Sequence, residues 1–273
     1  MNALWIPIAS VLTAAILIHH PIEGDEEKLP SAAVLLDTHV DATGGKEARL
    51  KVKSRRMTGK IAIDIAGHKL DAKVERRSQA PGSSHLLVDG SFLHQVRVCN
   101  GKDAWEWSVS HGHDSGEHRH DSGETRLFEG GEKTRAIEQA RFYAAVHWRD
   151  VYKEVRTVGM EDVEGQPAYE VKLTSKSGDK STRFYDKKTG RLVKTLKTVD
   201  SPHMGKLEME IYHEDYREID GIWLPMKVRE VLNSEDFGKG TQIWTYTKIE
   251  HDVKLPSSLF EMPDELQDRH KGN

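Results

Sequence analysis

The sequence LEMEIYH, residues 207–213, alternates apolar and polar side chains, and two later runs repeat this pattern. After a turn at Asp220-Gly221 the run IWLPMKVR occupies residues 222–229, and TQIWTYTK occupies residues 241–248. Successive side chains of a strand point to opposite faces, so the alternation predicts strands with one apolar face and one polar face. Parallel strands are usually buried on both faces, and these strands are therefore expected to form an antiparallel sheet.

Similar runs predict strands along most of the remaining chain. Pairs such as Asp89-Gly90 and Asn100-Gly101 favour tight turns between them, because these residues tolerate positive φ. The expected strands cover residues 54–65, 68–79, 84–89, 92–99, 103–108, 153–160, 167–174, 180–186, 191–199, 205–217, 222–232 and 238–250. We therefore expect a sheet of about eleven or twelve strands.

Two amphipathic segments predict helices. Ser31 is a suitable N-cap for a helix over residues 31–43, Gly44-Gly45 ends it, and residues 46–52 are expected to add one more turn. Residues 132–151 carry apolar side chains at helical spacing, and this second helix is apolar enough to cover the concave face of a sheet. The order helix, strands, helix, strands predicts one α+β domain over residues 31–263, followed by a flexible charged tail at 264–273.

Length, charge and cysteine content exclude several classes of protein. The chain has 273 residues, 31% of them charged, and a net charge of −4, so no basic field indicates a nucleic-acid partner. The single cysteine, Cys99, excludes an internal disulfide and any multi-cysteine metal site. Its place in an alternating run is typical of a small buried hydrophobic residue. We expect a monomer.

The N-terminal segment has the composition of an export signal. Residues 1–22 contain no Asp, Glu, Lys or Arg, and residues 4–18 are strongly apolar. This length is typical of a signal-peptide core and short for a membrane-spanning helix, which needs about 20 residues. Residues 21–30 form an acidic linker bounded by prolines. We expect residues 1–30 to comprise a signal peptide or an uncleaved anchor plus this linker, and the protein to reach the periplasm or cell envelope.

Residues 109–131 interrupt the strand pattern with a tandem repeat, HGHDSGE followed by HRHDSGE. The imidazoles of His111, His113, His118 and His120 are of the kind that binds Zn²⁺, Cu²⁺ or Ni²⁺. Several glycines within the repeat argue against a rigid site, and no residues are evident that would orient the histidines. We interpret this segment as a polar His-rich loop with adventitious metal binding at most, and expect no cofactor.

The sequence contains none of the common catalytic motifs. It has no Gly-x-Ser-x-Gly, no His-Glu-x-x-His and no phosphate-binding glycine-rich loop. The adjacent pair His213 and Glu214 lies in a predicted strand, where alternation places the two side chains on opposite faces. We therefore expect that the protein is not an enzyme.

Four phrases of turn and strand residues carry a family resemblance: ATGGKEA at 42–48, FYDKKTGRLV at 184–193, YREIDGIWLP at 216–225 and SLF at 258–260. Over residues 32–262 the sequence resembles the LolA-like outer-membrane lipoprotein-sorting proteins of bacteria, in an exported branch. The resemblance implies an unclosed antiparallel β half-barrel whose apolar concave face is covered by helices. It also implies binding of acyl chains and offers no catalytic residues. The His-rich loop departs from the family pattern, in which this region is a short connection.

The apolar face of the sheet is the candidate binding site, and the sequence leaves two alternatives for it. Either acyl chains of lipids or lipoproteins occupy a cavity there non-covalently, or the two helices fill it. A carrier would exchange its load with inner- and outer-membrane envelope proteins. The alternative function is a non-catalytic envelope interaction or metal-binding protein that uses the His-rich loop. The candidate lining residues are Ile61, Ile63, Phe142, Trp148, Leu207, Met209, Ile211, Leu224, Met226, Val228 and Ile243.

Overall fold

The computed structural model describes residues 28–65, 67–91, 93–110, 123–201, 205–236 and 238–271. Within them, 13 strands form one antiparallel sheet in the order β6-β5-β4-β3-β2-β1-β13-β12-β11-β10-β9-β8-β7. The end strands β6 and β7 do not pair with each other, so the sheet is an unclosed half-barrel, as expected. The strands are β1 Ser54–Ile65, β2 His68–Gln79, β3 Ser83–Gly90, β4 Leu93–Cys99, β5 Ala104–Ser110, β6 Glu124–Leu127, β7 Tyr152–Val163, β8 Gln166–Ser175, β9 Lys180–Asp186, β10 Leu192–Ser201, β11 Gly205–Ile219, β12 Ile222–Ser234 and β13 Gly238–His251.

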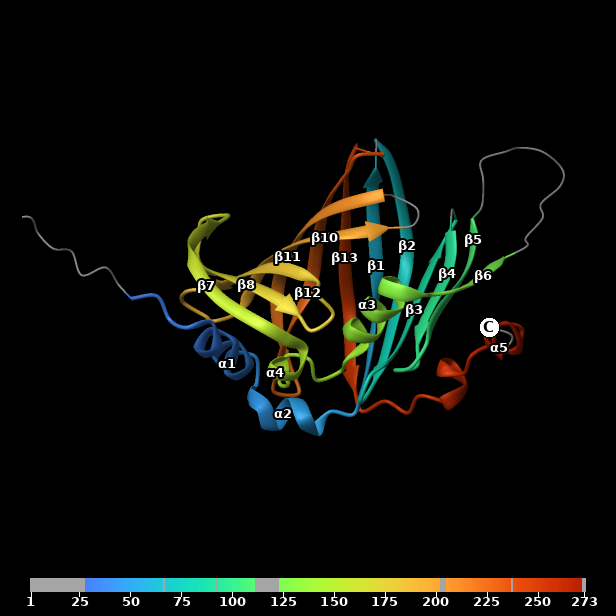
Figure 1. Ribbon diagram of the computed structural model, residues 1–273, viewed down its shortest axis with the longest axis horizontal. Coiled ribbons are helices and arrows are strands. Elements are labelled where there is room, and N and C mark those ends of the chain that lie inside the picture. The colour runs from blue at the N-terminus through green and yellow to red at the C-terminus, as the bar shows by residue number, and fades with distance from the viewer. Residues whose placement is uncertain are drawn as a thin grey trace, which may run out of the picture.

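The pairing of β1 with β13 joins two meanders that are distant in the sequence. Consecutive strands are neighbours within β1–β6 and within β7–β13, and only this one pairing connects the two halves of the sheet. Across it, Ile61 lies opposite Trp244 and Ile63 opposite Gln242. Figure 1 shows the sheet curving from β7 through β13 and β1 to β6, with α3 (Gly130–Ala140) in front of the opening.

Helices α1 (Ala32–Ala42) and α2 (Gly45–Lys51) form as predicted and cover one end of the half-barrel. The Ser31 side chain accepts a hydrogen bond from the Val34 N–H and caps α1. Gly44, at φ +111°, joins the two helices, and a Cβ there would collide with the carbonyl oxygen of Gly221. Only glycine therefore allows this close approach to the β11–β12 turn.

The second predicted helix is wrong in its middle. Residues 132–151 divide into α3, a series of turns at 142–147, and the short helix α4 (Trp148–Val151). The Phe142 N–H donates to the carbonyl of Pro81, and the Tyr143 hydroxyl donates to the carbonyl of Val52 at 2.9 Å. These bonds join residues 142 and 143 to segments far away in the sequence, which is why helical spacing alone did not reveal the break.

Two boundaries also differ from expectation. Residues 124–127, assigned to the His-rich loop, form β6 and pair with β5. Four residues are too few for alternation to be recognised. The expected flexible tail is also wrong for residues 264–271, which form α5 (Asp264–Lys271) after the 3-10 turn η1 (Ser257–Phe260). Leu266 is 1% exposed and packs with Val98 and Trp105 on the outer face of the sheet, so this segment is attached.

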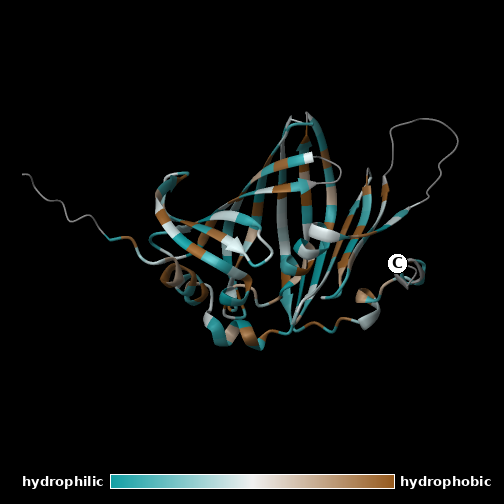
Figure 2. Cartoon of the chain, in the orientation of Figure 1, coloured by the Kyte–Doolittle hydropathy of each residue, from teal (hydrophilic) through white to brown (hydrophobic). Residues whose placement is uncertain are grey.

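Both faces of the sheet contain apolar clusters. The cluster at the centre of the concave face includes Ile61, Leu224 and Met226. On the opposite face of β9–β11, Phe184 packs with Leu196 and Tyr212. Figure 2 shows hydrophobic and hydrophilic residues alternating along the long strands. Both faces of the half-barrel therefore contribute to its core.

Candidate functional site

The centre of the concave face is packed by the protein itself. Ile61, Leu224 and Met226 are buried together, and Ile63 and Phe142 pack against them. Phe142 comes from the turns that follow α3, and the Arg55 guanidinium lies 5.4 Å from the centre of its ring. For these five residues the structure therefore favours the filled alternative over an open cavity.

Trp148 packs away from this central cluster, against α1. It is buried together with Leu36 and Val171. Its Nε1–H donates to Asp37 Oδ1 at 2.8 Å, and Arg149 forms an ion pair with the same carboxylate. Trp148 thus fastens α4 to α1.

Ile243 lies on the outer face of the sheet, so its predicted place among the lining residues is wrong. It pairs with Ala62 and Arg229, whereas its neighbour Trp244 pairs with Ile61 and Val228 on the concave face. Trp244 and Tyr246 are apolar too, and alternation within this strand therefore does not decide which set points inward.

A cavity of about 360 Å³ separates α3, the following turns and α4 from the concave face of β9–β11. Ile211 is the one predicted lining residue that borders it, and Ala144, Val151 and Leu192 add further apolar surface. Leu207, Met209 and Val228 share the face of Ile211 through the β11–β12 register, but they do not border this cavity. A second cavity of about 430 Å³ lies on the other side of the same turns, and Ala144 and Val151 border both.

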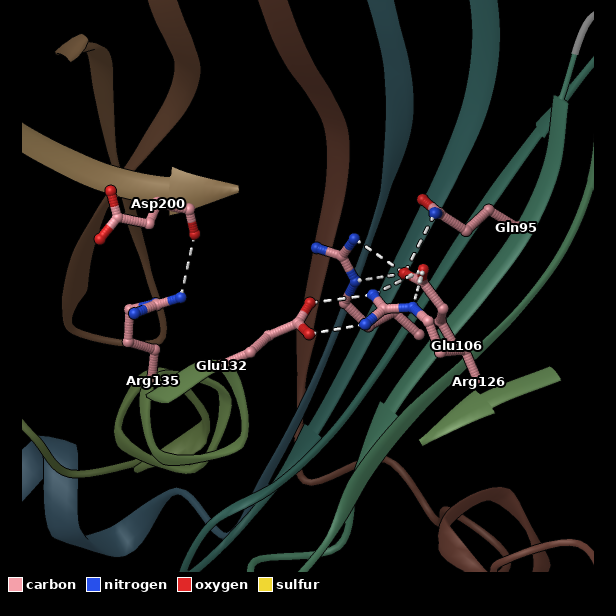
Figure 3. Close-up of polar contacts among 7 residues, drawn as sticks. Gln95, Glu106, Arg126, Glu132, Arg135 and Asp200 are labelled. Carbon is pink, nitrogen blue, oxygen red and sulfur yellow. Dashed lines mark hydrogen bonds and ion pairs between the residues drawn. The ribbon is translucent and has the colours of Figure 1, made fainter. Parts of the chain in front are cut away.

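Polar contacts hold α3 across the mouth of the half-barrel (Figure 3). On one side Glu132 accepts two hydrogen bonds from Arg126 of β6, at 2.6 and 2.9 Å. On the other side Arg135 donates to the backbone carbonyl of Asp200 in β10 at 3.1 Å. These contacts link α3 to both arms of the open sheet.

Buried Glu106 anchors this bridge. It accepts hydrogen bonds from Arg126 and Arg97, and from Gln95 at 3.3 Å. Burial opposes its ionisation, but the two guanidinium groups outweigh that effect and lower the pKa of the Glu106 carboxyl. Arg126 thus connects a fixed carboxylate in the sheet to Glu132 on the helix.

The concave face of β9–β11 carries basic side chains, whereas the alternation predicts an apolar face. Arg183, Lys197 and His213 border the 360 Å³ cavity. Burial, together with nearby Arg183 and Lys197, lowers the pKa of His213 to about 4. Sequence reasoning missed Arg183 and Lys197, because both faces of these strands carry apolar residues and the pattern does not orient a lone cation.

Other expectations can be compared with the described residues. His213 faces the cavity, and Glu214 forms ion pairs with Lys227 and Arg229 on the other face, as alternation predicted. Cys99 is 3% exposed, and burial raises the pKa of its thiol. His111, His113, His118 and His120, and residues 1–27, lie outside the part of the chain that the structure describes. Within that part, no group of three or more His, Cys, Asp or Glu side chains is arranged to bind a metal.

Comparison with solved structures gives the family of folds. A LolA superfamily protein from Nitrosomonas europaea superposes with a TM-score of 0.53 at 15% identity, covering 86% of this chain and 99% of that one. The protein has a LolA-like fold. A DUF1329 family protein from Desulfovibrio piger gives a TM-score of 0.55 at 15% identity, covering 84% of this chain and 97% of its own.

A third structure has the same architecture. An outer membrane lipoprotein-sorting protein domain from Vibrio parahaemolyticus gives a TM-score of 0.50 at 10% identity, over 79% of this chain and 93% of that one. No protein-family model and no curated protein matches the sequence. The similarity therefore concerns the fold and confirms the half-barrel that the sequence resemblance implied.

None of the helices within the described residues has the length and apolar character needed to cross a bilayer.

Proposed function

We propose that this LolA-like protein is a non-catalytic carrier that holds acyl chains of lipids or lipoproteins in its half-barrel. The observation that carries the proposal is the cavity beneath α3. It lies inside an unclosed sheet, and apolar residues including Ile211, Val151 and Leu192 form part of its wall. An acyl chain gains about 0.8 kcal/mol for each methylene removed from water, so a ten-carbon chain would gain about 8 kcal/mol.

The attachment of α3 suits a reversible cover. The contacts that hold it across the mouth are hydrogen bonds and ion pairs of charged side chains. Water can replace such bonds at a small cost in free energy when the helix moves. A ligand could then enter without unfolding the packed centre around Ile61 and Met226. We further propose that the protein acts in the periplasm or cell envelope and exchanges its load with membrane-associated partners, by analogy with the outer membrane lipoprotein-sorting domain that shares its fold.

Native mass spectrometry of the full chain, purified from a bacterial periplasm without an affinity tag, tests the carrier function. We expect co-purifying lipid or acylated peptide, identified after organic extraction. The Ile211→Glu variant should lose this ligand, because a carboxylate would enter the wall of the cavity. The matched control is Ile243→Glu on the outer face of β13, which should keep it.

Two results would contradict the proposal. A ligand-free mass in the wild-type protein, with no uptake of added lipid, would mean that the helices close the half-barrel permanently. A mass raised by a divalent metal in place of lipid would instead support the alternative function through the segment His111–His120.

A further inference from the structure

The cavity beneath α3 contains more positive than negative charge. Four basic side chains border it and only two acidic ones, and its basic residues come from the helix, from the β8–β9 hairpin and from β10. None of the six forms an ion pair with another residue that the structure describes. The basic residues are Arg135, Lys180, Arg183 and Lys197, and the acidic ones are Glu138 and Asp179.

Arg183 is the innermost of these cations. It lies on β9 opposite Thr195 of β10, and its guanidinium is 5.4 Å from the centre of the Tyr152 ring. Its buried Nε has no hydrogen-bond acceptor, and the groups that favour its charge are the phenols of Tyr152 and Tyr185, the latter beside it on the same strand face. A buried polar atom without a hydrogen-bond partner is unfavourable, and more so when it belongs to a charged group. Arg183 is therefore a buried cation that has no carboxylate partner among the described residues.

Lys197 adds a second cation two residues along the same face of β10. Side chains two apart on one strand are about 7 Å apart, and neighbouring strands about 4.8 Å apart, so Arg183 and Lys197 border a common space. Burial lowers the pKa of the Lys197 ammonium, and the carboxylates of Glu230 and Asp179 oppose this effect only in part. Neither carboxylate forms an ion pair with Lys197 among the described residues, so the ammonium has no direct carboxylate contact there.

Neutral donors complete the lining. Thr195 Oγ1 lies 3.3 Å from Nε2 of His213, and both residues border the cavity between the two cations and Ile211. His213 does not compete with the cations for an anion, since its low pKa keeps it neutral. Arg135, on the cover helix α3, faces the same space from the other side.

We propose that this cavity binds the phosphate headgroup of an anionic amphiphile, with Arg183, Lys197 and Arg135 as its cationic donors. Three cations on three separate elements suit a group with three outer oxygen atoms. Apolar surface at Ile211, Val151 and Leu192 adjoins this polar part and would receive the start of the acyl chain. The inference rests on the proposed carrier function and names its ligand class. Binding would also supply a hydrogen-bond acceptor for the buried Nε of Arg183.

Calorimetric titration of the full chain with three probes separates the headgroup from the chain. Dodecyl phosphate carries both, dodecyl maltoside carries the chain with a neutral head, and inorganic phosphate carries the anion alone. All are used below their micelle-forming concentrations. We expect dodecyl phosphate to bind at least tenfold more tightly than dodecyl maltoside, and inorganic phosphate to bind weakly.

Two variants test the cations. Lys197→Met and Arg183→Gln should each weaken dodecyl phosphate binding at least tenfold and leave dodecyl maltoside unchanged. Lys172→Met is the matched control, because Lys172 is exposed on the opposite face of the adjacent strand β8. The urea midpoint of ligand-free Lys197→Met should equal or exceed that of the wild type, since the variant removes an unpaired, partly buried charge.

The outcomes distinguish the two proposals. Equal affinity for dodecyl phosphate and dodecyl maltoside, unaffected by either variant, would overturn the phosphate site and leave the carrier function standing. Binding of inorganic phosphate as tight as that of dodecyl phosphate, with no binding of dodecyl maltoside, would overturn the carrier function and assign the cavity to free phosphate. A large loss of stability in Lys197→Met would show that Lys197 is a structural charge and would also overturn the phosphate site.

Discussion

His39 and His213 are neutral inside the half-barrel, and each is held by one hydrogen bond. His39 of α1 lies 3.3 Å from the carbonyl oxygen of Gly190, and His213 lies at the same distance from the Thr195 hydroxyl. Burial, with nearby arginines, lowers the pKa of His39 to about 3, and that of His213 falls to about 4. In an unfolded chain both would titrate near the ordinary value of about 6.5.

The two histidines should make folding less favourable as the pH falls from 7 to 5. In this range the unfolded chain binds protons that the folded protein does not, so stability decreases as the pH drops below about 6.5. At pH 5 each histidine accounts for a loss of about 2 kcal/mol. Urea unfolding at pH 7 and pH 5 measures this, and His213→Gln should show a loss that is smaller by about that amount.

The control for this experiment is His68→Gln, since His68 is exposed on β2. It should retain the pH dependence of the wild type. An identical dependence in wild type and His213→Gln would show that His213 is protonated in the folded protein, contrary to its surroundings.

Single residues also mark where sequence reasoning succeeds and where it stops. Ile61 and Met226 were predicted on the concave face and lie there, because in their strands one set of alternating residues is clearly the more apolar. Ile243 was misplaced because its strand is apolar on both sides, at Ile243 and at Trp244. The inward orientation of Arg183 and Lys197 could not be predicted, since the sequence does not distinguish a cation that points into a cavity from one that points into solvent.

Among the elements, α3 is the one whose attachment depends on a few polar contacts. Its apolar residues Ala136, Ile137 and Ala140 pack only near one end of β4 and β5, around Cys99 and Ala104. Its polar attachment consists of the bridge from Arg126 through Glu132, the ion pair of Lys133 with Asp103 at 2.7 Å and the bond from Arg135 to the carbonyl of Asp200. Such an element should open locally at a lower free energy than the sheet beneath it.

Replacement of Glu132 by Gln should loosen α3 selectively. Loss of the carboxylate removes the charge that pairs with Arg126, although Arg126 keeps Glu106 as a partner. We expect amide hydrogen exchange in residues 131–140 to accelerate roughly 3- to 10-fold, equivalent to about 1 kcal/mol, while exchange in β1 and β2 is unchanged.

Glu129→Gln is the matched control for this change. Glu129 precedes α3 and makes no side-chain capping bond, so the variant removes the same charge near the helix start without breaking the bridge. Equal acceleration in both variants would attribute the effect to the helix dipole and not to the contact with Arg126.

The extent of α3 shows what the sequence could not give at this scale. Local periodicity predicted one helix over residues 132–151, which includes all of α4 and all of α3 except its first two residues. Its break depends on Pro81 and Val52, the partners of Phe142 and Tyr143 from the other half of the chain. The presence of a helix can be predicted from the local spacing of apolar residues, whereas the position of this interruption depends on tertiary contacts.

At the scale of the whole molecule, the seam between β1 and β13 decides whether the two meanders form one sheet. The register shifts there, so that Thr58 pairs with Lys248 and Gly59 with Tyr246. A Cβ on Gly59 would collide with the carbonyl oxygen of Thr245. At this register shift the two halves of the sheet thus approach too closely for a side chain on residue 59.

Gly59→Ala should destabilise the protein as a unit. Backbone at the seam must move to admit the methyl group, and overpacking of this kind costs about 1–3 kcal/mol. We expect a lower urea midpoint and faster hydrogen exchange in strands of both meanders. Gly159→Ala is the control, because Gly159 also lies at a register shift, in β7, but the nearest atom to its Cβ would be 4.0 Å away. An effect confined to the residues around position 59 would mean that the halves are stable without each other.

The architecture as a whole was predictable from the sequence. Strong alternation in β11–β13, together with turns and the family resemblance, yielded an unclosed antiparallel half-barrel with covering helices, and the structure confirms it. Order and register of distant strands were not predictable from local pattern, because β1 and β13 carry no sequence signal that identifies them as partners.

The same seam has a consequence for the newly made chain. All other pairings join strands that follow one another in the sequence. In contrast, β1 cannot complete its pairing until β13, the last strand to be synthesised, has been made. At typical translation rates the ribosome needs on the order of 10–40 s to make the intervening chain. During that time β1 is the edge of a partial sheet, with Ile61, Ile63 and Ile65 on one face and unpaired backbone groups along its length. The nascent protein therefore passes through a stage in which its most aggregation-prone edge is the middle of its future sheet.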